Sequence, residues 1–222
     1  MTAPNPSLEI LYQDDQLVAI NKPSGMLVHR GWAQDRFTAL QCLRRQIGAY
    51  VHPIHRLDRG TSGVLIFALS QEMARSMQAK LEEESIHKVY LALCRGVRAD
   101  LGRIDHPLAK EKGGVKQAAV TEFKLLESFG RYGLFQASPQ TGRTHQIRRH
   151  LKHASHPIIG DTRYGKGEHN RLFREQYDFS RLGLHCLRYE FNHPHSGELL
   201  KIEAPLPIEF ARVLERLASG VG

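Results

Sequence analysis

The segment from His55 to Gly63 carries the side chains that are best suited to chemistry. It reads His-Arg-Leu-Asp-Arg-Gly-Thr-Ser-Gly, which places the Asp58 carboxylate between Arg56 and Arg59 on a glycine-bounded turn. Two nearby guanidinium groups favour the ionised form of a carboxylate, and that form suits a nucleophile or a base better than a general acid. The alternative is a turn aspartate that accepts backbone hydrogen bonds and forms a surface ion pair.

A second group of candidate residues lies between Arg143 and Lys152. Arg143 follows a glycine, and the helix predicted after it carries Arg148, Arg149 and Lys152 on its polar side. The whole chain has 31 Lys and Arg residues against 23 Asp and Glu residues, a formal net charge of +8. Because clustered positive charge attracts polyanions, this helix predicts contacts with nucleic-acid phosphates. The alternative is a solvated helix face without a partner.

The composition limits the class of protein. The 222 residues can bury a core without disulfides, and the three cysteines are scattered, with no Cys-x-x-Cys pair. The chain starts without a secretory pattern, and its longest apolar run, from Val64 to Leu69, is too short to span a bilayer. We therefore expect a soluble, cytoplasmic monomer with a flexible tail at residues 1–7 and a single catalytic domain at residues 8–222.

The histidines do not predict a metal site. Four of the 13 histidines fall close together, at His145, His150, His153 and His156, but no cysteine or carboxylate lies among them. Neighbouring arginines would also repel a cation. The chain lacks the phosphate-binding P-loop, the Gly-x-Ser-x-Gly nucleophile turn and the zinc-deaminase pattern. These enzyme classes are therefore not indicated.

Apolar periodicity predicts the elements that position these residues. Tyr90 is expected on the less apolar face of a strand, and Ser70 and Thr144 are expected to cap helices. Many strands joined by short turns predict an α+β fold with a large, mixed, mostly antiparallel sheet flanked by helices. Strands are expected at residues 8–12, 17–20, 64–69, 88–94, 119–126, 134–137, 184–191 and 198–204, and helices at 38–50, 71–81, 145–154 and 208–218.

Six ordered segments together resemble one family, the RluA-type pseudouridine synthases. The resemblance covers nearly the whole chain, and the nine residues around Asp58 are its most specific part. It implies the pseudouridine synthase catalytic fold and a cofactor-free isomerisation of uridine to pseudouridine in RNA. The segments are Asn-Lys-Pro-x-Gly at 21–25 with Val28-His29, the segment 55–63, Lys88-x-Tyr90, Thr-Gly-Arg-x-His-Gln-Ile-Arg at 141–148, His-Pro-Ile-x-Gly-Asp at 156–161 and Leu184-His185.

The resemblance also implies roles for individual residues. Asp58 matches the essential carboxylate, which either attacks the sugar carbon or removes a ribose proton. Arg143 matches the arginine that pairs with this carboxylate. Tyr90 matches the tyrosine that stacks on the target base and helps to remove its C5 proton, and Leu184 matches the apolar residue on the other side of the pocket. Arg56 matches the arginine that replaces the flipped nucleotide in the RNA stack, the alternative being a plain ion pair with Asp58.

The remaining basic residues, Arg59, Arg148, Arg149 and Lys152, are expected to contact RNA, so that binding should weaken with salt. The chain enters its first strand almost at once, so we expect no S4-type RNA-binding domain before it. Several segments, including Leu27 to Arg30 and Leu43 to Gly48, are most similar to the tRNA pseudouridine synthase C type, which modifies a uridine at position 65 of tRNA. A 23S rRNA uridine is the alternative substrate. A non-catalytic RNA-binding protein and an RNA N-glycosylase are the alternative functions.

Overall fold

The computed structural model describes residues 6–30, 35–98, 101–110 and 113–220, and the chain divides into two compact units. The first unit comprises Met1–His87 and Cys186–Pro205, and the second comprises Lys88–His185 and Leu206–Gly222. The chain passes between the units at three places: within β5 (His87–Arg95), within β11 (Leu184–Asn192) and between Pro205 and Leu206. Each unit is described separately.

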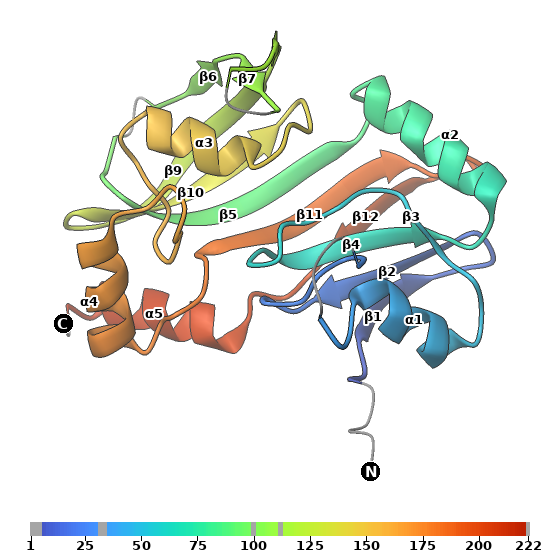
Figure 1. Cartoon of the computed structure of the whole chain (residues 1–222), viewed down its shortest axis with the longest axis horizontal. Helices are drawn as coiled ribbons and strands as arrows, with labels where there is room; N and C mark the ends of the chain where they lie inside the picture. Colours follow the sequence, from blue (N-terminus) through green and yellow to red (C-terminus); the bar gives the residue numbers. More distant parts are fainter. Residues whose placement is uncertain (1–5, 31–34, 99–100, 111–112, 221–222) are drawn as a thin grey trace. The chain divides into compact units, whose positions relative to one another are not determined.

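The first unit is built on antiparallel strands (Figure 1). Strand β2 pairs with β1 and β4, β3 pairs with the end of β4, and β11 forms a hairpin with β12. All seven residues of β4 are buried, so this strand lies in the core of the unit. The strands span β1 (Glu9–Gln13), β2 (Leu17–Lys22), β3 (His52–Pro53), β4 (Ser62–Ala68) and β12 (Leu199–Glu203).

The two helices of the first unit each begin after a residue whose side chain caps them. Helix α1 (Ala39–Ile47) is capped by the Thr38 side chain and ends at Gly48, which has the left-handed conformation. Helix α2 (Gln71–Glu82) is capped by Ser70, whose Oγ accepts a hydrogen bond from the backbone N–H of Met73 at 3.1 Å. Helix α1 therefore ends before Tyr50, the predicted end.

The second unit contains the antiparallel order β5-β10-β9-β6 and a separate pair, β7 with β8. Helix α3 packs against β9 and β10 (Figure 1). The strands span β6 (Arg103–Asp105), β7 (Leu108–Ala109), β8 (Lys116–Gln117), β9 (Val120–Phe129) and β10 (Tyr132–Pro139), and the helices span α3 (Gln146–His153), α4 (Gly167–Tyr177) and α5 (Ile208–Ala218).

These elements confirm the predicted α+β class and its mostly antiparallel strands. Two further local expectations are wrong, and one helix was missed. Thr144 is exposed and does not cap α3, which begins after His145. Tyr90 does not lie on a polar face of β5, because every residue from Lys88 to Cys94 is buried. A period of two alone does not distinguish a buried face of a strand from a solvent-exposed one. Helix α4 was not expected from the sequence. In the part of the chain described, no helix is long and apolar enough to cross a membrane.

Candidate active site

Asp58 lies in the loop between β3 and β4, in the first unit, and is half-buried. Its backbone carbonyl accepts a hydrogen bond from the Thr61 N–H at 3.0 Å, which closes a tight turn over Arg59 and Gly60. The turn leads directly into Thr61 and Ser62, whose side chains are buried. The carboxylate is thus carried by a short loop that is fixed to the core strand β4.

The turn that follows β2 holds the Asp58 loop from the other side. Lys22 is fully buried, and its ammonium donates to the carbonyls of Pro23 and Met26, each at 2.8 Å, and of Arg59 at 3.3 Å. The Gly25 N–H donates to the same Arg59 carbonyl at 2.8 Å. A buried ammonium needs such partners, so Lys22 ties the two turns together. The sequence indicated this lysine only as part of a motif.

The two arginines beside Asp58 have different environments. Arg59 donates from Nε to the Gly25 carbonyl at 3.0 Å and forms an ion pair with Asp35. Arg56 is exposed, and among the described residues its guanidinium makes no ion pair. The structure therefore does not contain the Arg56–Asp58 ion pair that the sequence offered as an alternative. Arg59 helps to fix the loop, whereas the Arg56 side chain is open to solvent.

His55 anchors the start of the same loop. Its Nε2 accepts a hydrogen bond from the Ile66 backbone N–H at 3.1 Å, so the ring proton is on Nδ1, which lies 3.1 Å from the Tyr189 hydroxyl. The two rings also stack, with centroids 4.5 Å apart. Gly63 closes the loop at its other end, because a Cβ there would lie 2.0 Å from the Cys186 carbonyl oxygen. Only glycine fits that position.

Tyr90 and Arg143 belong to the second unit. Tyr90 is buried on β5 and lies opposite Ala137 of β10. Strand β10 ends at Pro139, and the turn that contains Arg143 follows four residues later. Tyr90 and this turn therefore lie at the same end of the β5-β10 pair. Leu184, the first residue of β11, is buried.

Gln146 holds the Arg143 turn from within. Its Oε1 accepts from the Thr141 hydroxyl at 2.7 Å and from the Arg143 backbone N–H at 3.0 Å. Its Nε2 donates to the carbonyl of Val120 and the hydroxyl of Thr121, each at 2.9 Å. These four contacts satisfy the buried amide and fix its orientation. This role could not be predicted from the sequence, because the partners of Gln146 at the start of β9 lie far away along the chain.

The Arg143 side chain is exposed on this turn. Its Nε donates to the Ala118 carbonyl at 3.0 Å, which aligns the side chain along the segment before β9. Within the described ranges, its two terminal nitrogens make no hydrogen bond. They are therefore available to a carboxylate or a phosphate.

The hydrogen-bond chain behind Gln146 continues to helix α3. His150 is fully buried, and its Nδ1 lies 3.0 Å from the Thr121 hydroxyl. Its Nε2 faces the His106 carbonyl at 3.0 Å and must therefore carry the ring proton. Burial lowers the pKa of His150 below its ordinary value. A neutral imidazole thus connects to the Arg143 turn through Thr121 and Gln146.

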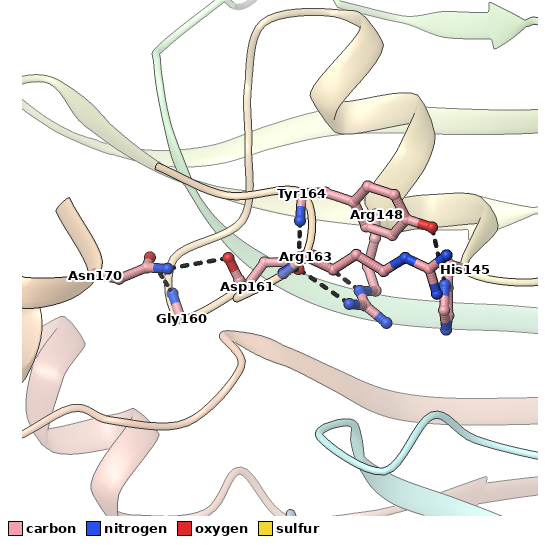
Figure 2. Close-up of polar contacts among 7 residues, drawn as sticks. All are labelled: His145, Arg148, Gly160, Asp161, Arg163, Tyr164 and Asn170. Carbon is pink, nitrogen blue, oxygen red and sulfur yellow. Dashed lines mark hydrogen bonds and ion pairs between the residues drawn. The ribbon is translucent and has the colours of Figure 1, made fainter. Parts of the chain in front are cut away.

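Asp161 organises the loop after α3 (Figure 2). Arg148 binds it through two hydrogen bonds, from Nε to Oδ2 at 2.8 Å and from Nη2 to Oδ1 at 3.0 Å. The backbone N–H groups of Arg163 and Tyr164 also donate to Oδ1, each at 2.9 Å. Burial by itself would raise the pKa of Asp161, but the hydrogen bonds from Arg148 and the backbone hold it below its ordinary value.

The same loop reaches the residue that starts α3. The Tyr164 hydroxyl lies 3.0 Å from Nδ1 of His145, which has the left-handed conformation with φ 54° (Figure 2). A non-glycine residue adopts this conformation only where its surroundings support it. Tyr164 and Asp161 therefore hold both sides of the first turn of α3, two residues after Arg143.

The Asp58 loop and the Arg143 turn fall within one region that matches a protein family. A family model described as RNA pseudouridylate synthase matches residues 16–153, which include Asp58, Tyr90 and Arg143. The chain belongs to the RNA pseudouridylate synthase family.

Curated relatives of this pseudouridylate synthase are similar over almost their whole length. The tRNA pseudouridine synthase C of Haemophilus ducreyi is 47% identical, with 90% of this chain and 91% of the relative covered. The enzyme of the same name from Vibrio vulnificus is 42% identical, with 94% and 95% covered. The enzyme described here is therefore an isomerase that acts on uridine in RNA, as the resemblance implied.

Solved structures agree with the fold of this pseudouridylate synthase. Human RNA Pseudouridylate Synthase Domain Containing 4 superposes with a TM-score of 0.79 and 28% identity, covering 95% of this chain and 93% of the human chain. Human RNA Pseudouridylate Synthase Domain Containing 1 superposes with a TM-score of 0.74 at 24% identity, covering 93% and 86%. The pseudouridine synthase fold expected from the sequence is confirmed.

The basic residues of this pseudouridylate synthase differ in how free they are. Arg148 is mostly buried in its ion pair with Asp161, and its contact with RNA stays a prediction. Arg149 donates from Nη1 to the Ala109 carbonyl at 2.8 Å, and Lys152 is exposed. Among the described residues, no group of three or more His, Cys, Asp or Glu side chains could hold a metal ion.

Proposed function

We propose that this pseudouridine synthase isomerises a single uridine of tRNA, of the position 65 type. The observation that carries the proposal is the 42–47% identity to enzymes named tRNA pseudouridine synthase C, with nine-tenths or more of both chains covered. Substrate preference in a compact enzyme depends on surface loops as well as on the active site. Similarity that extends beyond the catalytic segments therefore supports a shared substrate more than the catalytic motif alone does.

In the proposed reaction, Asp58 acts on the ribose of the target uridine. The bond from the sugar C1′ to N1 breaks, the base turns, and C1′ bonds to C5. C5 then loses its proton and N1 gains one, so the product has the same composition as the uridine. The carboxylate starts this sequence either by attacking C1′ or by removing a ribose proton, and both routes need it ionised. The Asp58 loop is fixed by Lys22, His55 and Gly63. This supports the proposed role, because a nucleophile or base must be held in position.

Arg143 supplies the cation for the Asp58 carboxylate in this proposal. Its terminal nitrogens are available, and its turn is fixed through the Gln146 side chain. An arginine fork can hold a carboxylate with two parallel hydrogen bonds, which orients it and keeps it charged. This role requires an arginine that a rigid turn holds in position, and not a mobile surface arginine.

The remaining proposed roles concern the flipped nucleotide. Tyr90 stacks on the target base and helps to remove the C5 proton, and Leu184 packs on the other side. Arg56 takes the place of the base in the RNA stack, for which its exposed guanidinium is suited. The RNA phosphates are contacted mainly by Lys152, and Arg59, Arg148 and Arg149 contribute less to this binding. RNA affinity should therefore fall as the salt concentration rises.

A direct experiment compares two RNAs. The purified protein is incubated with an unmodified tRNA transcript and, separately, with a 23S rRNA transcript, and pseudouridine is mapped by carbodiimide-dependent stops of reverse transcription. We expect one new stop in the tRNA and none in the rRNA. Stops confined to the rRNA would overturn the tRNA assignment. Release of free uracil without pseudouridine would overturn the isomerase reaction.

A further inference from the structure

Two histidines of the second unit form a stacked pair outside the proposed catalytic residues. His106 lies between β6 and β7, and His153 is the last residue of α3. Their ring centroids are 4.0 Å apart and their planes are within 16° of parallel. His153 is exposed and His106 is half-buried, so the pair is open to solvent on one side. This arrangement is called the His106–His153 pair below.

Contacts between α3 and the segment from His106 to Ala109 hold the pair in place. The backbone carbonyl of His106 accepts the hydrogen bond from His150, at 3.0 Å. Arg149 donates from Nη1 to the Ala109 carbonyl at 2.8 Å. The pair is therefore fixed from both elements, and its stacking does not depend on two flexible surface side chains meeting by chance.

The charged groups around the pair are mostly cationic. His106 faces Lys116 of β8 as well as Arg149, His150 and His153 of α3. Asp105, which precedes His106 in the chain, forms an ion pair with Arg103 at 3.4 Å. Burial lowers the pKa of His106 first, and the positive charges of His153, Lys116 and Arg149 lower it further. The neutral form of this imidazole is thus favoured while no anion is present.

An anion placed against the pair would reverse this balance. A phosphate offsets the repulsion between neighbouring cations and accepts hydrogen bonds from the ring N–H groups of the pair and from Lys116 or Lys152. A phosphodiester is the anion that an RNA substrate presents at every nucleotide. We propose that the His106–His153 pair binds a phosphodiester of the substrate RNA and that His106 takes up a proton when it does so.

This inference rests on the proposed function only in taking RNA as the ligand. Its distinctive consequence is thermodynamic linkage between protons and RNA. If binding raises proton occupancy at the pair, RNA affinity must increase as pH falls through the range in which His106 titrates. An ordinary lysine contact would give no such dependence in that range.

The test measures the Kd for an unmodified tRNA transcript by filter binding from pH 8.0 to pH 6.0 at constant ionic strength. We expect the wild-type protein to bind on the order of fivefold more tightly at pH 6.0 than at pH 8.0, the change produced by partial uptake of one proton. His106→Gln and His153→Gln should each lose most of this increase, so that each variant binds nearly as weakly at pH 6.0 as at pH 8.0. His195→Gln, which alters an exposed histidine of the first unit, is the matched control and should keep it.

Near-UV circular dichroism at each pH establishes that every variant is folded. Calorimetry in two buffers with different ionisation enthalpies then counts the protons taken up on binding, and the count should fall in both His variants. The proposal is overturned if all four proteins show the same pH dependence, or if the His106 and His153 variants weaken binding equally at every pH. Pseudouridine formation is assayed separately, so failure of the proposed function would be seen in a different measurement.

Discussion

Thr121 shows how one hydroxyl can fix a catalytic turn from a distance. His150 presents an unprotonated Nδ1, so the Thr121 hydroxyl donates its proton there and uses a lone pair to accept from Gln146. This directionality in turn presents Oε1 of Gln146 to the Arg143 backbone N–H. The position of the proposed catalytic arginine thus depends on a buried threonine that touches neither the arginine nor RNA.

Thr121→Val replaces this hydroxyl with a methyl group of the same size. We expect the single-turnover rate of pseudouridine formation to fall roughly 5- to 30-fold, the effect of losing about 1–2 kcal/mol from a buried hydrogen-bond network. The Kd for tRNA should change little, because the turn is loosened and no RNA contact is removed. Thr121→Ser keeps the hydroxyl and should restore most of the rate.

The comparison of the two Thr121 variants separates positioning from packing. Equal losses of rate in the Ser and Val variants would show that packing of the Thr121 side chain, and not its hydrogen bonds, controls the rate. A loss of tRNA affinity alone in Thr121→Val would likewise contradict a positioning role.

Single residues with local partners were the easiest to predict from sequence. Ser70 is correctly predicted to cap α2, whereas the catalytic roles of Asp58 and Arg143 stay predictions from their motifs. The motifs contain Lys22 and Gln146 but do not indicate their structural roles. Their partners, Arg59 and Thr121, are 37 and 25 residues away along the chain. Such long-range hydrogen bonds leave no periodic signal in a sequence.

At the scale of elements, strong apolar periodicity gave the right answer and weak periodicity did not. Helix α5 was predicted at the residues where it is found, with Phe210 and Val213 buried. Helix α4 contains only three apolar residues among its 11, Leu172, Phe173 and Tyr177, which are too few to give a recurring apolar spacing. Secondary structure of this kind depends on tertiary contacts, which sequence periodicity does not report.

The start of α3 was mispredicted for a related reason. Thr144 is a favourable capping residue, yet the chain turns through a left-handed His145 instead. The Gln146 side chain supports this turn from one side, and Tyr164 contacts His145 from the other. The local preference of Thr144 is overridden because these tertiary hydrogen bonds fix the backbone of the neighbouring turn.

Helices α3 and α4 each bury a histidine, which makes the stability of the fold depend on pH. Burial lowers the pKa of His150 and of His169 below the ordinary value of 6.5. Above that value both states are neutral and the stability is fully present. As pH falls below it, the unfolded chain binds protons that the folded protein refuses, so the free energy of unfolding decreases by up to about 1.4 kcal/mol per pH unit for each histidine.

Urea unfolding at pH 7.5, 6.5 and 5.5 checks this expectation. The free energy of unfolding should be nearly constant between the first two values and lower at pH 5.5. His169→Gln should have a weaker pH dependence, whereas His87→Gln, a change at an exposed position, should behave as the wild type does. A free energy of unfolding that stays level or rises from pH 6.5 to pH 5.5 would contradict the account.

At the scale of the whole molecule, the residues of the proposed reaction are divided between the two units of the chain. Asp58 and Arg56 come from the first unit, and Tyr90, Arg143 and Leu184 come from the second. The family resemblance could be predicted from sequence because its motifs occur in both parts in a fixed order. The division into two compact units could not, since no linker or change of composition marks the boundaries at His87 and Cys186.

The proposed isomerisation depends on one carboxylate, that of Asp58, which binding of tRNA does not require. The most direct measurement is pseudouridine formation in an unmodified tRNA transcript by Asp58→Asn, with the Kd for the same RNA measured in parallel. Asp15→Asn, which neutralises an exposed carboxylate in the β1–β2 turn, is the control. The account predicts no detectable pseudouridine with Asp58→Asn, a Kd within about twofold of wild type and full activity in the control. Wild-type turnover by Asp58→Asn would contradict it.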